Sequence, residues 1–290
     1  MKNDPYEIIS NSIIESLNKG IIPWQKPWKG SNSSHGPRNM ISGKPYRGIN
    51  YFILSMKGYT SPYWMTFNQV KSKGGYVRKG EKSTNVVWWG FYEKTINDEN
   101  GETSVECYPK LKYFKVFNLE QCDDIVAPNE DLNVVEEFNN IDKAEEIIKG
   151  YKDRPDIIHY EQNAYYRPTT DIINMPVKVS FINEEEYYST IFHELAHSTG
   201  HSDRLNREGV TDNNSFGSHE YSKEELVAEF TACFLSGEAG ILSKVKDNST
   251  AYIQNWASRI KNDNRLIISA CSQATKACDY ILGKHNSPEE

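Results

Sequence analysis

The sequence predicts an α+β protein of two domains, and three observations support this prediction. Residues 1–126 hold 17 Lys and Arg against 12 Asp and Glu, whereas residues 127–290 hold 16 against 28. The basic half contains short strand patterns rich in aromatic residues, and the acidic half contains a helical pattern with two histidines four residues apart. Because 290 residues suit one large or two ordinary domains, we expect a first domain over 1–126, a linker over 127–140 and a second domain over 141–290.

The composition is typical of a globular protein, with 38% hydrophobic and 25% charged residues. No apolar run approaches the roughly 18 residues of a membrane helix, and the first residues contain no apolar core of a secretory signal. The five cysteines are odd in number and form no CxxC pair. This pattern favours a reducing cytoplasm and disfavours cysteine-bound zinc, so we expect a cytoplasmic protein with no membrane partner.

Helix and strand patterns can be assigned in the first half. Residues 4–19 place isoleucines and a leucine at helical spacing, and Gly20 ends the pattern. Prolines and tryptophans alternate over 23–28, so that segment is predicted to be extended. Residues 86–92 and 113–117 read as strands, and 97–101 as a turn between them. The first domain is therefore expected to be a small, mostly antiparallel sheet with helices.

Aromatic and basic residues are concentrated in this half, which contains 19 of the chain's 35 aromatic residues. Single-stranded nucleic acid is held by aromatic faces that stack on bases and by cations that follow the phosphates. The aromatic side chains that could stack on bases are Trp24, Trp28, Tyr46, Tyr51 and Trp64. The basic side chains that could follow the phosphates are Lys26, Arg38, Lys44, Arg47, Lys79 and Lys82. An aromatic core with solvated lysines has the same composition, so composition alone leaves both interpretations open.

The second half begins with an acidic stretch that lacks periodicity, the linker over 127–140. A short helix is expected over 141–149 and one or two helices over 249–283. Short strands are predicted over 157–160, 164–166 and 178–181. Such strands would form a small sheet ahead of the helix that carries the histidines.

That helix contains the pattern HExxH at His193, Glu194 and His197. Residues four apart lie on one helix face, so both imidazoles can reach one metal ion, and Glu194 can take a proton from a water that the metal activates. The pattern lies inside a helix with its own signals. Asn183 and Glu186 fit a capping box, Ile182 and Tyr187 fit a hydrophobic staple, and Gly200 supplies a stop.

A catalytic zinc site takes three protein ligands, and three residues could provide the third. Asp203 stands where the pattern HExxHxxGxxH has its last histidine. Glu225 and Glu229 lie one helical turn apart on a second predicted helix that starts near Ser222. This ExxxE arrangement resembles that of the gluzincin class of zinc peptidases, and the resemblance implies Glu225 as the ligand and Glu229 as a carboxylate that orients a ligand histidine. Ser222 and Glu225 also fit a capping box, so Glu225 could instead only close the start of its helix.

Several motifs together resemble one known family, the ArdC-type antirestriction proteins of conjugative plasmids and other mobile elements. The motifs are PWxxPW at 23–28, GKPYRGIN at 43–50, WxTFxQ at 64–69, GGxVRKGEK at 74–82, VFNxxQ at 116–121, HELAHSTGH at 193–201, RLNR at 204–207 and EELVAE at 224–229. The resemblance covers roughly residues 5–280. It implies an N-terminal domain that binds single-stranded DNA and a C-terminal zincin-like metallopeptidase domain. One departure is Ser198, where the family often has tryptophan.

The resemblance favours Glu225 over Asp203 and implies one Zn²⁺ per chain, held by His193, His197 and Glu225. We therefore predict an antirestriction protein that binds single-stranded DNA and carries a gluzincin-like peptidase site, with a protein substrate or a restriction enzyme as its protein partner. The alternative is a non-enzymatic protein that shields DNA and has a structural or vestigial metal site. A primase or replication helper is less well supported, because no phosphate-binding glycine loop or acidic two-metal cluster is evident.

Overall fold

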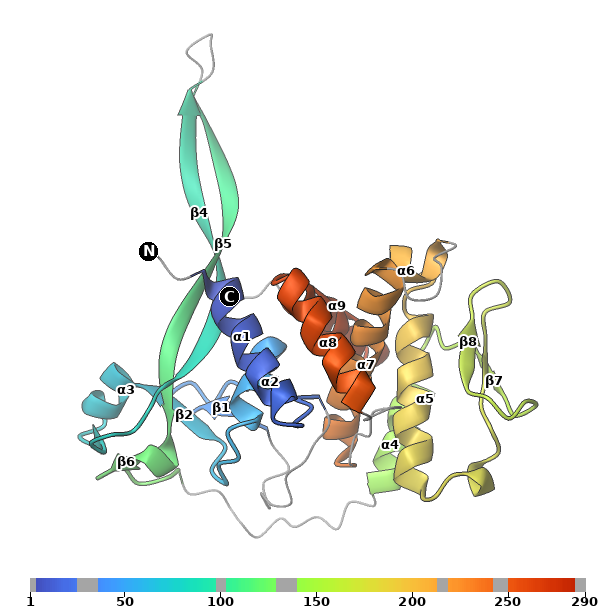
Figure 1. The fold of residues 1–290 in the computed structure, drawn as a ribbon, viewed down its shortest axis with the longest axis horizontal. Coiled ribbons are helices and arrows are strands. Elements are labelled where there is room, and N and C mark those ends of the chain that lie inside the picture. Colours follow the sequence, from blue (N-terminus) through green and yellow to red (C-terminus); the bar gives the residue numbers. More distant parts are fainter. Residues whose placement is uncertain are drawn as a thin grey trace.

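A computed structural model describes residues 4–24, 36–97, 103–128, 140–212, 219–241 and 250–284. The chain is α+β, as the sequence predicts. Figure 1 shows the strands of the first half on one side of the molecule and the helices of the second half on the other. Helix α1 lies beside α8, and the two elements are in contact.

The first half alternates short helices with strands. Its elements are α1 (Pro5–Asn18), β1 (Arg38–Asn39), α2 (Ile49–Ser55), β2 (Tyr63–Thr66), α3 (Phe67–Ser72), β3 (Tyr76–Val77), β4 (Thr84–Asn97), β5 (Thr103–Asn118), the 3-10 turn η1 (Leu119–Gln121) and β6 (Cys122–Asp123). One sheet has the order β1-β2-β5-β4 and is antiparallel except between β1 and β2. Strands β3 and β6 form a second, two-stranded sheet. The predicted mostly antiparallel sheet is therefore confirmed.

Strands β4 and β5 form a ribbon that is longer than the sequence predicts. They pair from Thr84 opposite Val116 to Asn97 opposite Thr103. The predicted turn over 97–101 falls mainly outside the described residues. In Figure 1 the end of the ribbon rises away from the helices. The sequence pattern identified only the inner part of each strand, where Val86, Val87 and Val116 are buried.

The second half consists mainly of helices around a small sheet. Its elements are α4 (Asn140–Gly150), β7 (Asp156–Ile158), β8 (Tyr165–Arg167), β9 (Ile172–Asn174), η2 (Lys178–Ser180), α5 (Glu184–Ser198), α6 (Glu208–Thr211), α7 (His219–Ala239), α8 (Thr250–Asn262) and α9 (Leu266–Ile281). Residues 129–139 of the predicted linker lie outside the described residues.

The third strand of the small sheet was assigned wrongly from the sequence. Residues 178–181 contain a 3-10 turn, and the strand that completes the sheet is β9, which lies between β7 and β8. Val177 and Val179 are strongly exposed, whereas Ile173 of β9 is fully buried. The β-branched residues around position 178 suit a strand in isolation, but only Ile173 has a core to enter.

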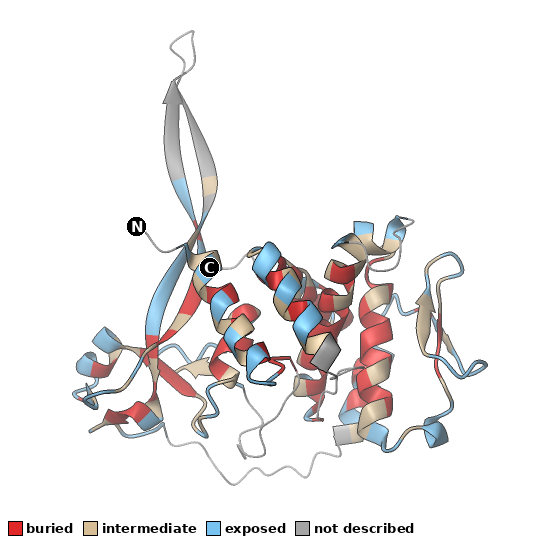
Figure 2. Cartoon of the chain, viewed as in Figure 1, coloured by how far each residue is buried: buried red, intermediate tan, exposed pale blue. Residues whose placement is uncertain are grey.

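The main hydrophobic core is shared by both halves of the chain. Ile9 and Ile13 of α1, together with Phe52 of α2, belong to the same buried cluster as Phe230 of α7 and Ile267 of α9. A second core lies under α5 and joins it to α4, α7 and α9. In Figure 2 buried residues cover much of α5. The expected domain boundaries thus remain a prediction, while the apolar packing extends across them.

Among the described residues, no helix is long and apolar enough to cross a membrane.

Candidate metal centre

Helix α5 carries the HExxH pattern and starts where the sequence predicts. The side chain of Asn183 accepts a hydrogen bond from the backbone N–H of Glu186 at 2.9 Å. The predicted staple is wrong, because Ile182 is 87% exposed and Phe181 instead packs edge-on against Tyr187. Glu186 accepts from the backbone N–H of Ile182, not from that of the cap residue. One half of the predicted capping box is therefore present.

Three side chains converge beside α5. The Nε2 atoms of His193 and His197 are 3.1 Å apart, and each lies 3.7 Å from an oxygen of Glu225 on α7. One ligand atom from each residue lies within 4.8 Å of the other two. Glu194 is buried next to His193 in the helix. The structure thus brings together the three residues that the sequence nominated as ligands.

These distances fit a single small cation. Ligand atoms held tetrahedrally at about 2.0–2.1 Å from a zinc-like ion lie about 3.3 Å from one another. The observed separations of 3.1 and 3.7 Å lie on either side of that value. Two imidazole nitrogens and one carboxylate also form the ligand set of one class of catalytic zinc sites. The residues present therefore suit a divalent metal.

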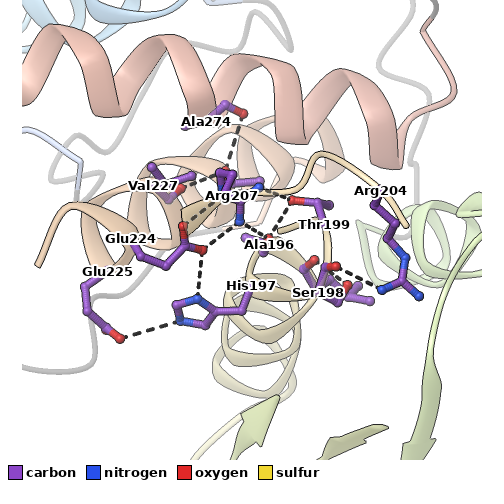
Figure 3. Close-up of polar contacts among 12 residues, drawn as sticks. Ala196, His197, Ser198, Thr199, Arg204, Arg207, Glu224, Glu225, Val227 and Ala274 are labelled. Atoms are coloured by element: carbon purple, nitrogen blue, oxygen red, sulfur yellow. Dashed lines mark hydrogen bonds and ion pairs between the residues drawn. The ribbon is translucent and has the colours of Figure 1, made fainter. Parts of the chain in front are cut away.

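Glu224 fixes the orientation of His197 through Nδ1, the ring nitrogen that does not face Glu225. Its carboxylate lies 3.1 Å from Nδ1 of His197 and accepts two hydrogen bonds from Arg207, at 2.8 and 2.6 Å (Figure 3). When Nδ1–H of a neutral imidazole donates to a carboxylate, Nε2 carries the lone pair. Glu224 thus leaves the Nε2 atom of His197 free to bind a cation.

Arg207 connects this carboxylate to the end of α5. The buried guanidinium also donates to the carbonyl of Ala196 and to the hydroxyl of Thr199, at 2.8 and 2.7 Å. Gly200 has a packing role here and does not form a left-handed stop. A Cβ on Gly200 would lie 2.5 Å from Val210 and 3.0 Å from Arg207. The glycine therefore allows the loop after α5 to fold closely over the helix end.

The electrostatics of the cluster favour a cation. Burial alone would lower the pKa of His193, but its contact with Glu225 and the charges of Glu229 and Glu194 raise that pKa to about 9. Burial would raise the pKa of Glu225, but the contact with His193 and the charges of both histidines lower it to about 2. The carboxylates thus stabilise positive charge at this position, whether it is a proton or a metal ion.

The fold reduces the number of residues that could serve as the third metal ligand. Helix α7 begins at His219, so Ser222 lies inside it and is not its cap. The side chain of Asp203 is 87% exposed and pairs with His201, away from the cluster. Glu225 therefore faces the two histidines, and the alternative interpretations of Asp203 and of the Ser222 capping box are wrong.

A carboxylate that the sequence did not nominate lies against one ligand histidine, while the predicted orienting role of Glu229 stays a prediction. Glu229 is buried and its charge acts on His193, but the carboxylate at the second ring nitrogen of His197 belongs to Glu224. Sequence reasoning missed Glu224. One signal could have found it, because a buried helix with two adjacent glutamates needs a partner for each charge. Arg207 provides that partner for Glu224.

Replacing Glu224 by glutamine is expected to weaken metal binding about 10–100-fold, because the carboxylate that holds His197 in its binding orientation is lost. Competition with a chromophoric chelator would measure the affinity, and circular dichroism would confirm folding. Glu238→Gln is the matched control, since Glu238 lies on the same helix and pairs with Lys284 at the surface. Equal affinities of the two variants would show that Glu224 does not orient the site.

The side chains predicted to contact nucleic acid include both buried and exposed ones. Trp24 is fully buried and packs edge-on against Phe230, so the prediction that it stacks on bases is corrected. Trp64 is likewise buried, against Tyr59. Tyr51 is half-buried and packs edge-on against rings of the shared core. Pro–Trp segments read alike in sequence whether their rings enter a core or remain free.

The predicted cations are more accessible. Lys44, Lys79 and Lys82 are exposed, and the exposed Arg47 forms an ion pair with Asp279. Arg38 and Tyr46 are half-buried, and burial raises the pKa of Tyr46. Lys26 and Trp28 lie outside the described residues. Contact of these side chains with DNA stays a prediction.

Comparisons with known proteins match both halves. Residues 3–117 match the N-terminal domain of the anti-restriction factor ArdC, and residues 142–273 match a zincin-like metallopeptidase family. The metal-free crystal structure of antirestriction protein ArdC from plasmid R388 is 35% identical, with a TM-score of 0.75 over 97% of each chain. This chain belongs to the ArdC family. The Mn(II)-bound structure of the R388 protein is similar as well, with 34% identity and a TM-score of 0.73 over 99% of this chain and 100% of that one.

Other relatives place the ArdC-like region in different contexts. Protein y4eC of Sinorhizobium fredii is 30% identical over 99% of this chain and 94% of its own length. Two proteins named DNA primase TraC from Escherichia coli are 34% and 36% identical over 96% and 97% of this chain. The chain spans only 20% and 27% of the length of those two relatives. An ArdC-family region therefore also occurs within much longer proteins.

Proposed function

We propose that this ArdC-family protein acts in the cytoplasm, binds single-stranded DNA and hydrolyses peptide bonds at a divalent-metal site. The observation that carries the proposal is the convergence of His193, His197 and Glu225, with Glu194 buried in the same helix. A structural metal site does not require a glutamate next to its first histidine. The presence of Glu194 at that place therefore favours catalysis.

The residues suggest a division of tasks. When bound, a divalent cation would polarise the substrate carbonyl and lower the pKa of a water molecule. Glu194 would take the proton of the attacking water and deliver it to the leaving amine nitrogen. Glu224 and Arg207 would keep His197 in position. We propose Zn²⁺ as the cation because of the donor set, and the Mn(II) found in the R388 relative makes Mn²⁺ the competing choice.

The DNA part of the proposal is based on charge and family. Residues 1–126 are net basic and residues 127–290 are net acidic, so phosphates would be attracted to the first half only. The exposed Lys44, Lys79 and Lys82 contribute to that attraction. Membership of the antirestriction family supports a role on DNA that enters a cell, with a restriction enzyme as the proposed protein substrate.

One observation also favours the non-enzymatic alternative. His193 and His197 belong to α5 and Glu225 to α7, so a bound cation would join the two helices and could stabilise the fold. In that case the protein would protect DNA by covering it, and the metal would be structural.

One experiment tests both parts of the proposal. Purified protein dialysed against Zn²⁺ or Mn²⁺ is expected to retain one divalent ion per chain by elemental analysis, and Glu225→Ala to retain none. Both are expected to bind a labelled oligothymidine of about 20 nucleotides, with an affinity that falls steeply between about 50 and 200 mM salt. Absence of metal in the parent protein would overturn the catalytic part of the proposal. Absence of DNA binding by the parent protein would overturn the DNA-binding part.

A further inference from the structure

The middle of the β4–β5 ribbon carries aromatic and basic side chains on one face. Successive side chains of a strand alternate between faces, and directly paired residues share a face. Trp88 pairs with Lys112, Gly90 with Lys110, and Tyr92 with Tyr108. We call this surface the aromatic ribbon face, made up of Trp88, Gly90, Tyr92, Tyr108, Lys110 and Lys112.

Gly90 makes room for the ring of Trp88. A Cβ on Gly90 would lie 1.9 Å from Cζ3 and 2.0 Å from Cη2 of Trp88, so the indole occupies the space of a side chain at position 90. Glycine weakens a strand and often marks a place where another group approaches the backbone closely. Here the approaching group is the indole, which remains 45% exposed. The strand thus holds a large aromatic ring along its surface without burying it.

The lysines of this face rest on its rings. Nζ of Lys112 lies 5.4 Å from the ring centre of Trp88, and Nζ of Lys110 lies 5.7 Å from that of Tyr92. Tyr92 and Tyr108 stack on each other, with centres 5.5 Å apart. An exposed cation–π contact is worth about 0.5–1 kcal/mol, whereas stacking of a base on an aromatic ring is worth about 1–3 kcal/mol. A base can therefore displace the ammonium group, which then stands beside the incoming phosphate.

The opposite face of the ribbon is different. Trp89 packs edge-on against Tyr6 of α1 and pairs with Leu111, which contacts the shared core. Phe91 is 76% exposed, and its partner in the strand register is Pro109. Aromatic rings with a lysine ammonium group over them thus distinguish the aromatic ribbon face. Phe91 provides an exposed ring of the same strand on the opposite face.

We propose that the aromatic ribbon face is the surface on which bases of single-stranded DNA stack, with Lys110 and Lys112 on the phosphates. This inference rests on the DNA binding proposed above. A duplex cannot present base faces, so stacking selects an unpaired strand. The ribbon rises away from the helices of the acidic half, where phosphates would be repelled (Figure 1). Trp88 and Tyr92 stand roughly 13 Å apart along the strand, so they would hold bases of an extended chain.

The test measures binding of a labelled oligothymidine by fluorescence anisotropy at low salt. Trp88→Ala is expected to weaken binding about 10-fold, and Trp88→Ala with Tyr92→Ala further. Phe91→Ala, the matched control on the opposite face, is expected to bind like the parent. Lys112→Gln is expected to reduce the slope of log affinity against log salt by about 1, because one phosphate contact is lost. A self-complementary hairpin duplex should compete poorly.

A second variant keeps the indole but moves it. Gly90→Ala forces the ring of Trp88 off the strand and is expected to weaken binding while near-ultraviolet circular dichroism shows a folded chain. Parent-like binding by both Trp88→Ala and Gly90→Ala, or equal competition by the duplex, would overturn the ribbon assignment and leave the proposed DNA binding intact. A parent protein that binds no oligothymidine would overturn both.

Discussion

Glu194→Gln is expected to abolish peptide hydrolysis and leave metal binding unchanged. Glutamine has nearly the same shape, but it cannot take a proton, and general acid–base catalysis typically contributes about 10²–10⁴-fold to a rate. The three candidate ligands His193, His197 and Glu225 stay in place. Cleavage of unstructured protein substrates, followed by mass spectrometry alongside elemental analysis, would measure both properties.

The control for this variant is Glu184→Gln, which changes an exposed carboxylate at the start of the same helix. Cleavage by Glu194→Gln at the parental rate would refute its role as the base. A restriction-protection assay in cells extends the test to function. If Glu194→Gln protects DNA as well as the parent, protection does not need hydrolysis and the shielding alternative gains support.

Trp24→Ala is expected to lower the free energy of unfolding by about 3–5 kcal/mol, the range for removing a large ring from a core. Trp24 is fully buried, contacts Phe230 edge-on with ring centres 5.1 Å apart, and donates from Nε1 to the hydroxyl of Tyr252 at 3.4 Å. The cavity would lie between the first half and α7. Urea unfolding followed by circular dichroism would measure the change.

Trp88→Ala provides the comparison for this variant, since the Trp88 ring is exposed on the ribbon and should change stability far less. If Trp24→Ala lost under about 1 kcal/mol, the ring would not be a core element. In that case the prediction from sequence that Trp24 stacks on DNA would deserve a new test.

The metal cluster could be predicted from the sequence because its geometry is local. His193 and His197 share a helix face by spacing alone, and Glu225 lies on a helix that is clearly recognisable. The partner of His197 could not be predicted in the same way. Glu224 and Glu225 are adjacent, so which one lies at the Nε2 atoms and which one at Nδ1 of His197 depends on the rotation of α7 against α5, and tertiary packing sets that rotation.

The fate of the aromatic residues shows the same limit. Trp24 packs against Phe230 and Tyr252, more than 200 residues away in sequence, which no local pattern reveals. Trp88 reads as an ordinary strand residue, and only the pairing with Lys112 and the space over Gly90 distinguish it. Strand β9 was missed because so short a pattern does not separate it from the stretch over 178–181, and only the burial of Ile173 shows which of the two enters the core.

The core shared by α1, α2, α7 and α9 restricts how this chain can be divided. A cut between residues 128 and 140 would leave each fragment with an apolar face that the other normally covers. Ile9, Ile13 and Trp24 would be exposed on one fragment, and Phe230 and Ile267 on the other. Neither fragment would inherit a complete core, so separately expressed halves should aggregate. Gene rearrangements would therefore be expected to transfer the two halves together, as one cassette.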